Sequence, residues 1–429
     1  MRRLRAILAL AAPTAGASVL QVASQLFETW LAARQGTEAL AGWAVVLPFA
    51  LLMTMMSGGG IGGGIASAIA RTLGGGRREE AAALVPHAVM IAAAASACFA
   101  LPFLLAPRTV LALVGGPGPA DAAAAYAAWL FGAGALPFWM VNTLASVLRG
   151  GGQHARAARV MQLAWLAYPP VAWLLAEPAG LGLAGMGIAF AACFWAGAIA
   201  MARLVLRGGA GFAPDLRARP RRALFGRILS VGLVASGLAV LANLTTIMVT
   251  AQLAPRGAAV VAGYGIAVRL EFVMIPIVFG VGSALTALVG RAVGAGDWAE
   301  ARRIAWTGGG LAFAIAGACG LAATIFPQAF VAAFTADPAV AVIATRAIGL
   351  IGPAYAAFGL GMALYFAAQG AGRMAGPVLA AFSRFGIAVG GGALLAGPFG
   401  LDGQFAAVAL GLVSYGVFSA GAVRPGVWR

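Results

Sequence analysis

Charged residues are scarce in this chain, and lysine is missing altogether. Only 9% of the 429 residues are charged, and all 28 basic residues are arginines; soluble proteins carry about 25% charged residues. Hydrophobic residues make up 62% of the chain and are spread along its whole length. This excludes a soluble domain, and also a soluble domain held by one anchor. The composition predicts an all-α polytopic membrane protein, because such hydrophobicity favours spanning helices over a barrel.

The arginines do not indicate a nucleic-acid-binding protein. The formal net charge is +16, but the arginines are scattered between apolar runs and form no single basic patch. We therefore expect the lipid bilayer as the surrounding partner and no nucleic acid.

Residues for metal binding and catalysis are few. Cys98, Cys193 and Cys319 each lie in an apolar run with no second cysteine nearby, which excludes a disulfide framework and metal-ligand spacing. The two histidines, His87 and His154, belong to no Ser–His–Asp arrangement. We therefore expect no enzyme, no metal site and no cofactor.

An internal repeat organises the chain. The stretch IGGGIASAIARTLGGGRREEA at 61–81 corresponds to VGSALTALVGRAVGAGDWAEA at 281–301, an offset of 220 residues. The matched pairs at this offset are Gly62/Gly282, Arg71/Arg291, Gly74/Gly294, Gly76/Gly296, Glu80/Glu300, Ala81/Ala301, Pro107/Pro327, Gly150/Gly370 and Gly152/Gly372. The chain is thus one unit used twice.

Twelve apolar segments are long enough to cross a membrane as helices. We predict spans at 7–33, 40–70, 81–106, 122–148, 160–177, 184–206, 228–254, 259–290, 304–327, 340–368, 376–396 and 404–423.

The arginines also predict the topology. On the side of the N-terminus lie 22 of the 28, whereas the opposite loops hold Arg34, Arg108 and Arg256, with Arg346 near a helix start. By the positive-inside rule, both termini should be cytoplasmic.

The domain limits follow from the same pattern. We expect an N-lobe of six helices at 1–206, a cytoplasmic linker at 207–227 and a C-lobe of six helices at 228–429. Six spans per repeat leave the two copies parallel, with a cavity between them.

Several turn motifs resemble one known family. LVGRAVGAGDWAEARR and SAIARTLGGGRREEA resemble the glycine–acid turns of the multidrug and toxic compound extrusion (MATE) transporters, and LRGGGQ and AQGAGR resemble the turns after their helices four and ten. ETWLAARQGTEALAGWAVVLP resembles the family's first helix with its acidic residue. The resemblance covers essentially the whole chain.

The resemblance implies a fold and an activity. It implies twelve transmembrane helices in two six-helix lobes that form a V-shaped cavity. It also implies a secondary active antiporter that exports amphipathic, often cationic, drugs or metabolites in exchange for protons or sodium ions. The expected setting is the bacterial inner membrane, with the protein as a multi-pass monomer.

Two of the twelve acidic residues, Glu28 and Glu271, lie inside apolar spans. Ionisable groups in the membrane are costly unless paired or neutralised, and they are candidate functional residues. Glu28 aligns with the acid that the family uses for coupling in helix 1. The family's Asn and Asp of helix 5 are missing, and Gln21, Gln25 and Tyr168 are candidate replacements at the substrate cavity. The alternative is an acid at the outer end of helix 1, wetted by the interface.

In the second repeat, Glu271 lies about 18 Å from the outer end of its predicted helix and Arg384 about 12 Å from the inner end of its own. In a core of about 30 Å these side chains share one depth, so they could pair and take part in cation coupling, or form a pair of structural importance alone. Asn243 stands near the place where one branch of the family has an acid in helix 7, and we include it among the cavity candidates.

Coupling to protons is favoured over sodium. A sodium site needs several oxygen ligands, whereas a proton needs one carboxylate that changes protonation between an apolar and a wet environment. The alternatives left open are sodium-coupled antiport and a lipid-linked oligosaccharide flippase of the same superfamily, although flippases tend to line the cavity with several basic residues. A receptor or scaffold with the same fold also remains open.

Overall fold

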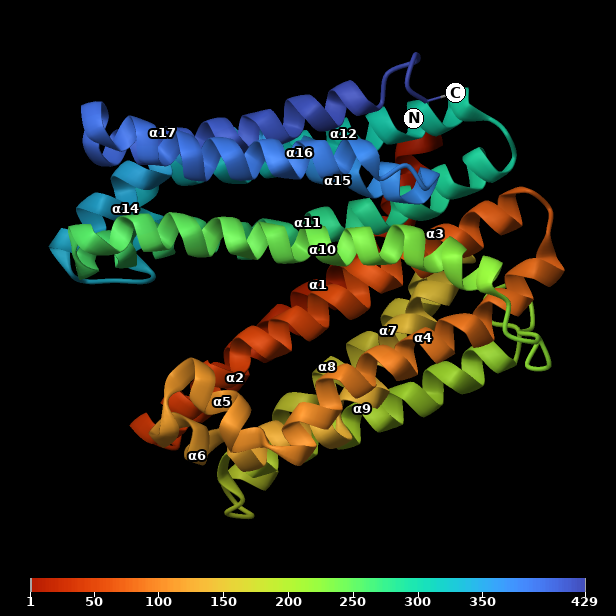
Figure 1. Cartoon of the computed structure of the whole chain (residues 1–429), viewed down its shortest axis with the longest axis horizontal. Helices are drawn as coiled ribbons and strands as arrows, with labels where there is room; N and C mark the ends of the chain where they lie inside the picture. Colours follow the sequence, from red (N-terminus) through yellow and green to blue (C-terminus); the bar gives the residue numbers. More distant parts are fainter. Residues whose placement is uncertain (1, 429) are drawn as a thin grey trace. The chain divides into compact units, whose positions relative to one another are not determined.

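The computed structural model describes residues 2–428, and all regular elements in this range are helices (Figure 1). These residues form two units of packed helices. The first unit is Ala12–Ser236; the second comprises the described chain from Gly237 onward together with the residues before Ala12.

The first unit is built from the helices of the first half. They are α1 (Arg2–Arg34), which starts in the second unit, α2 (Thr37–Met55), η1 (Met56–Gly60), α3 (Ile61–Gly74), α4 (Arg78–Leu105), α5 (Pro107–Gly115), α6 (Pro117–Ala127), η2 (Ala128–Ala133), α7 (Ala135–Gly150), α8 (His154–Ala176), α9 (Gly182–Leu206) and the beginning of α10 (Arg222–Leu253).

The second unit repeats this order. It holds the rest of α10, η3 (Ala254–Arg256), α11 (Ala258–Gly294), α12 (Trp298–Ile325), α13 (Pro327–Ala332), α14 (Pro338–Ile351), η4 (Gly352–Ala354), α15 (Tyr355–Ala371), α16 (Ala375–Phe385), η5 (Gly386–Gly391) and α17 (Gly392–Ala422).

The prediction of a polytopic all-helical membrane protein is confirmed. Among the described residues, nine helical segments are long and apolar enough to span a membrane, and a bent pair, Pro117–Ala133 with Ala135–Gly150, makes a tenth. The predicted fifth span corresponds to α8, a helix of 23 residues that is not among these segments. The predicted last two spans form one helical run, Ala375–Ala422, broken at Gly400, where the backbone leaves helical geometry and the run folds back so that α16 packs against α17.

The repeat seen in the sequence is also present in the structure. Gly76 and Gly296, 220 residues apart, both end a helix with positive φ, 75° and 82°. Only glycine adopts this conformation at little cost. Pro107 and Pro327 each stand at the first position of a short helix, α5 and α13, where a proline's missing N–H costs nothing.

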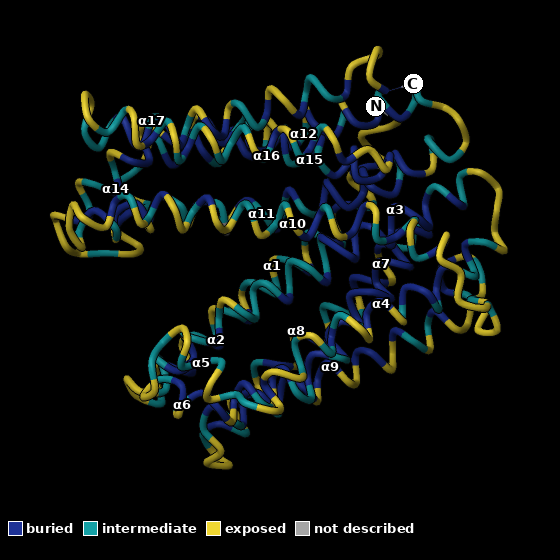
Figure 2. Tube along the Cα trace, in the orientation of Figure 1, coloured by how far each residue is buried: buried dark blue, intermediate teal, exposed yellow. Residues whose placement is uncertain are grey.

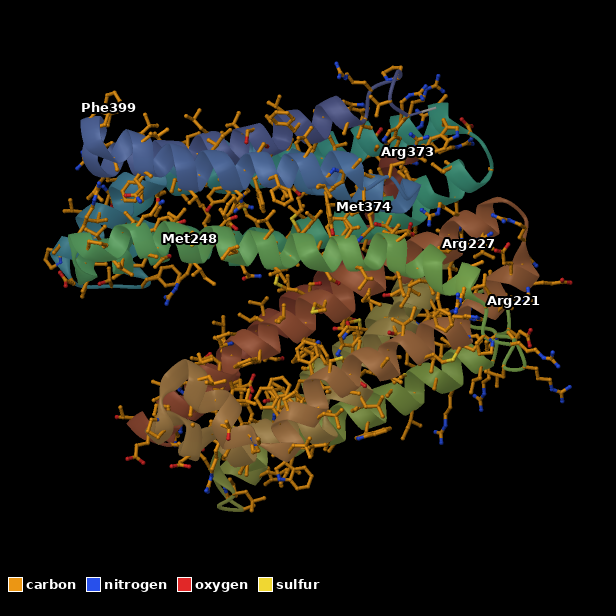
Figure 3. All side chains as sticks on the ribbon, in the orientation of Figure 1. Arg221, Arg227, Met248, Arg373, Met374 and Phe399 are labelled. Atoms are coloured by element: carbon orange, nitrogen blue, oxygen red, sulfur yellow. The ribbon has the colours of Figure 1, made fainter. Side chains whose placement is uncertain are left out.

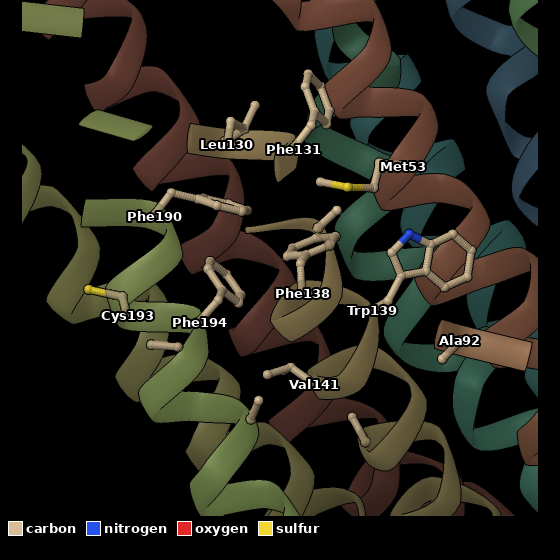
Figure 4. Packing of buried hydrophobic residues seen from close by; sticks show 14 of the residues in the cluster. Met53, Ala92, Leu130, Phe131, Phe138, Trp139, Val141, Phe190, Cys193 and Phe194 are labelled. Atoms are coloured by element: carbon tan, nitrogen blue, oxygen red, sulfur yellow. The ribbon is translucent and has the colours of Figure 1, made fainter. Parts of the chain in front are cut away.

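An aromatic cluster fills the first unit (Figure 4). Phe138 of α7 and Trp165 of α8 both pack edge-to-face on Phe194 of α9, with ring centroids 4.9 Å apart in each case. Trp165 in turn packs on Tyr168, with centroids 6.2 Å apart. The cluster fixes α8 against α7 and α9, on the sides that Figure 2 draws as buried.

The linker between α9 and α10 is attached to the first unit. The Asp215 amide donates to the Ala82 carbonyl at 3.1 Å, the Arg221 amide donates to Nε2 of His87 at 2.9 Å, and Arg227 pairs with Glu80. Arg221 and Arg227 are labelled in Figure 3. The linker is therefore held along the start of α4.

Both ends of the described chain reach α12 in the second unit. Arg3 makes two hydrogen bonds of 2.7 and 2.8 Å to Glu300, and Arg302 donates to the Trp428 carbonyl at 2.6 Å. The two ends thus lie at the same end of this unit, which is what an even number of spans requires.

Candidate functional site

Glu28 lies in α1 and is buried, with 9% of its surface exposed. Two phenol groups donate to the same carboxylate oxygen, Oε1: Tyr168 of α8 at 2.8 Å, and Tyr126 of α6. Trp43 of α2 lies near both Glu28 and Tyr126. Four helices therefore converge on one carboxylate.

The backbone around this carboxylate is held by polar contacts between helices. The Ser24 hydroxyl, one turn before Glu28, donates to the Trp165 carbonyl at 2.8 Å and joins α1 to α8. Thr14 and His154 join the same two helices further along, with their Oγ1 and Nδ1 atoms 3.1 Å apart. On the other side, Gly187 of α9 lies against Tyr126, where a Cβ would come within 2.8 Å of the Tyr126 carbonyl oxygen. The site is thus preorganised.

The surroundings of Glu28 are neutral. Its hydrogen-bond partners are two phenols, an indole lies nearby, and no ion pair forms at Glu28 among residues 2–428. The nearest charged pair along α1 is Arg34 with Glu177, at 2.6 Å on the surface. There the Arg34 guanidinium, by hydrogen bonding, lowers the pKa of Glu177 below its usual range. Glu28 and Glu177 thus have opposite environments.

The other predicted residues of the first site are placed differently. Tyr168 contacts Glu28, as described. Gln21 and Gln25 are half-buried on α1, and among the described residues neither makes a hydrogen bond to Glu28. Asn243 is exposed on α10 and donates to the Ala239 carbonyl of its own helix at 2.9 Å.

The structure brings together Glu271 and Arg384, the predicted pair of the second repeat. Nη2 of Arg384, in the last turn of α16, lies 3.2 Å from Oε1 of Glu271 in α11. The guanidinium also lies over the ring of Phe358 at 5.1 Å. Arg269, the neighbouring basic residue, points elsewhere, over Phe334 at 5.2 Å.

Sequence reasoning missed Tyr126 and Trp43. One signal was available: Tyr126 and Tyr168 are the only tyrosines between residues 1 and 263. A phenol kept in an alanine-rich helix needs a hydrogen-bond partner when it is buried, and Glu28 is the acid inside an apolar span of that half. For Trp43 there was no such signal.

The described residues hold no cluster of three or more metal-ligating side chains. The arrangement can instead bind and release a proton at a carboxylate, and can recognise charge at an ion pair. These features, on two repeated sets of membrane-spanning helices, define a membrane transporter.

The chain belongs to the MatE family. The family model matches residues 13–174 and again 233–394, so both ends of the second match lie 220 residues after those of the first. The resemblance in the turn motifs and the repeat are thereby confirmed, and the family is one of transporters rather than enzymes.

A curated relative and solved structures agree with this. A probable multidrug resistance protein NorM of Xanthomonas campestris is 33% identical over 168 residues, which cover 38% of this chain and 36% of the relative. A MATE transporter of Vibrio cholerae, VcmN in the bent form, has a TM-score of 0.91 at 20% identity, covering 99% of this chain and 97% of that one. A MOP superfamily transporter from Pyrococcus furiosus has a TM-score of 0.92 at 21% identity, covering 99% and 96%. At these identities the structures show a shared fold.

Proposed function

We propose that this transporter is a secondary active antiporter that exports amphipathic, cationic drugs or metabolites in exchange for protons. The observation that carries the proposal is the environment of Glu28: a buried carboxylate in a membrane span, bound by neutral donors. An acid without a fixed counter-ion can be neutralised by a proton without leaving a cation unpaired.

The same environment favours a proton over sodium. A sodium ion needs several oxygen ligands, usually with carboxylates among them, and the side chains hydrogen-bonded to Glu28 offer no second carboxylate. Tyr126 and Tyr168 are donors to a charged carboxylate. A phenol can also accept a proton in a hydrogen bond, so the same cluster can hold Glu28 in both protonation states.

The substrate class is supported by family membership and by the multidrug resistance relative, of which 36% is aligned. The cell membrane of a bacterium is the proposed location, with the protein acting as a monomer. The excess of arginines on one side supports cytoplasmic termini.

A transport assay in proteoliposomes tests the proposal, with ethidium as the cationic probe. An imposed proton gradient should drive ethidium transport in sodium-free buffer, and a protonophore should stop it. Glu28→Gln should abolish this transport while the protein stays folded. Glu177→Gln, a surface acid of the same unit, is the matched control and should keep the wild-type rate. Transport that requires sodium and ignores the proton gradient would contradict proton coupling.

A lipid-linked oligosaccharide flippase would behave differently in the same vesicles. It would move a fluorescent lipid-linked sugar across the bilayer and leave ethidium untransported.

A further inference from the structure

The ion pair of Glu271 and Arg384 is the least exposed of the described ion pairs, yet it is weakly hydrogen-bonded. Its side chains are 15% and 13% exposed, less than in any other ion pair of the described residues. Yet it makes a single hydrogen bond of 3.2 Å. The more exposed pair Arg3–Glu300 makes two, at 2.7 and 2.8 Å.

A purely structural buried ion pair is stable only when hydrogen bonds saturate both groups. Here Oε2 of Glu271 and the other nitrogens of Arg384 make no hydrogen bond in the described part of the chain. The pair therefore presents an acceptor and several donors, side by side, to a ligand.

The backbone at Arg384 is closely packed. Gly411 of α17 packs against α16, where a Cβ would lie 3.0 Å from the Arg384 carbonyl oxygen. Two residues after Arg384 the π-helical segment η5 begins at Gly386, and such segments are frequent at functional sites. The backbone that carries Arg384 is thus fixed against α17.

Aromatic rings surround the pair. Phe358 lies under the guanidinium at 5.1 Å, and Tyr415 packs next to Phe358 with ring centroids 6.1 Å apart. Tyr264 and Tyr355 are close enough to Glu271 to interact electrostatically with its carboxylate. The site combines two opposite charges with flat apolar surface.

The net charge of the site selects its ligand. A simple cation at Glu271 would sit next to Arg384 and leave one positive charge uncompensated in a poorly solvated place. A molecule with one cationic and one anionic group compensates both side chains at once. We propose that Glu271 and Arg384 form a recognition site for zwitterionic amphiphiles, with the ammonium group at Glu271 and the carboxylate at Arg384. This inference rests on the proposed export function and extends its substrate class.

Three fluorescent ligands that share one body test the site. They are Nε-dansyl-lysine, a zwitterion; its methyl ester, a cation; and its Nα-acetyl derivative, an anion. Binding to the purified protein in lipid nanodiscs is followed by dansyl fluorescence. The wild type should bind the zwitterion about tenfold more tightly than either other ligand, a difference of about 1.4 kcal/mol. Equal binding of the ester and the zwitterion would overturn the proposal.

Variants assign the preference to the pair. Arg384→Gln should remove the advantage of the zwitterion over the ester, whereas Arg384→Lys, which keeps the charge, should retain most of it. Arg346→Gln removes an arginine from a more exposed ion pair of the same unit, with Asp402, and should bind like the wild type. If Arg384→Gln does not fold, the proposal is still tested by the order in which the wild type and Arg384→Lys bind the three dansyl ligands. An unchanged preference in a folded Arg384→Gln protein would refute the assignment.

Glu28→Gln separates this inference from the proposed function. It should stop proton-driven transport yet keep the preference for the zwitterion. Proton-driven transport without that preference would refute the recognition site alone. The preference without proton-driven transport would refute proton-coupled export alone.

Discussion

The hydroxyl of Tyr168 lies 2.8 Å from Oε1 of Glu28, across 140 residues of sequence. Hydrogen bonds to a charged group contribute about 1.5–3 kcal/mol, more than bonds between neutral groups. Tyr126 donates to the same oxygen, so the two phenols and the carboxylate form one hydrogen-bonded cluster. Loss of any of these three side chains should therefore alter transport.

Tyr168→Phe tests this directly. The substitution removes one donor and keeps the ring that packs on Trp165, so we expect a folded protein whose proton-driven transport is about tenfold slower. The rate is measured in proteoliposomes. Tyr365→Phe, which alters a half-buried tyrosine of the second unit, serves as the control. Equal rates in Tyr168→Phe and the wild type would mean that Tyr168 only fills space.

The topology can be tested by labelling single cysteines in a protein from which the native Cys98, Cys193 and Cys319 have been removed. Leu216 lies in the linker and is 67% exposed, so Leu216→Cys should react with an impermeant maleimide only after the cells are opened. Arg256→Cys, in a predicted outer loop, should react in intact cells. The reversed pattern would invert the proposed orientation.

The sequence predicted much of this fold because its strongest signals are local. Apolar runs indicate spans without knowledge of their neighbours, and all twelve predicted spans have helical counterparts. The two candidate acids stood out for the same reason, since Glu28 and Glu271 interrupt such runs. What surrounds an acid, by contrast, depends on helix packing, and so the contact of Glu28 with Tyr126 was not predictable from spacing.

The irregular helical segments were also invisible in the sequence. The π-helical segments η1, η2 and η5 have no hydrophobic period of their own within apolar runs. The attachment of the linker 207–227 was not predictable either, since its composition predicts only a cytoplasmic linker. It is held instead through backbone amides, to His87 and to Ala82, and such bonds leave no trace in residue type.

His87 provides a test of that attachment. Its ring is buried, with Nδ1 2.7 Å from the Ala83 carbonyl oxygen, so Nε2 is free to accept from the Arg221 amide. His87→Leu removes this acceptor and should free the linker, at a cost of about 1 kcal/mol. Limited trypsin digestion at the arginines of 207–227 should become several times faster. Cys98→Ala, an exposed change in the same helix, is the control and should be digested at the wild-type rate. If His87→Leu is also digested at the wild-type rate, the hydrogen bond from the Arg221 amide does not hold the linker.

The repeated turns give the last prediction. Gly76 and Gly296 have positive φ, and a Cβ at either position would meet no atom within 4 Å. Gly76→Ala and Gly296→Ala therefore change only backbone strain, and each should lower the free energy of unfolding by about 1 kcal/mol. The two sites lie in different units, so the double variant should lose the sum of both effects.

Gly226, in the regular helix α10, also has open space around a Cβ, and Gly226→Ala should be neutral or slightly stabilising. Unfolding in a detergent titration measures all four variants. If the turn variants are as stable as Gly226→Ala, the left-handed turns are not what the repeat preserves at these positions.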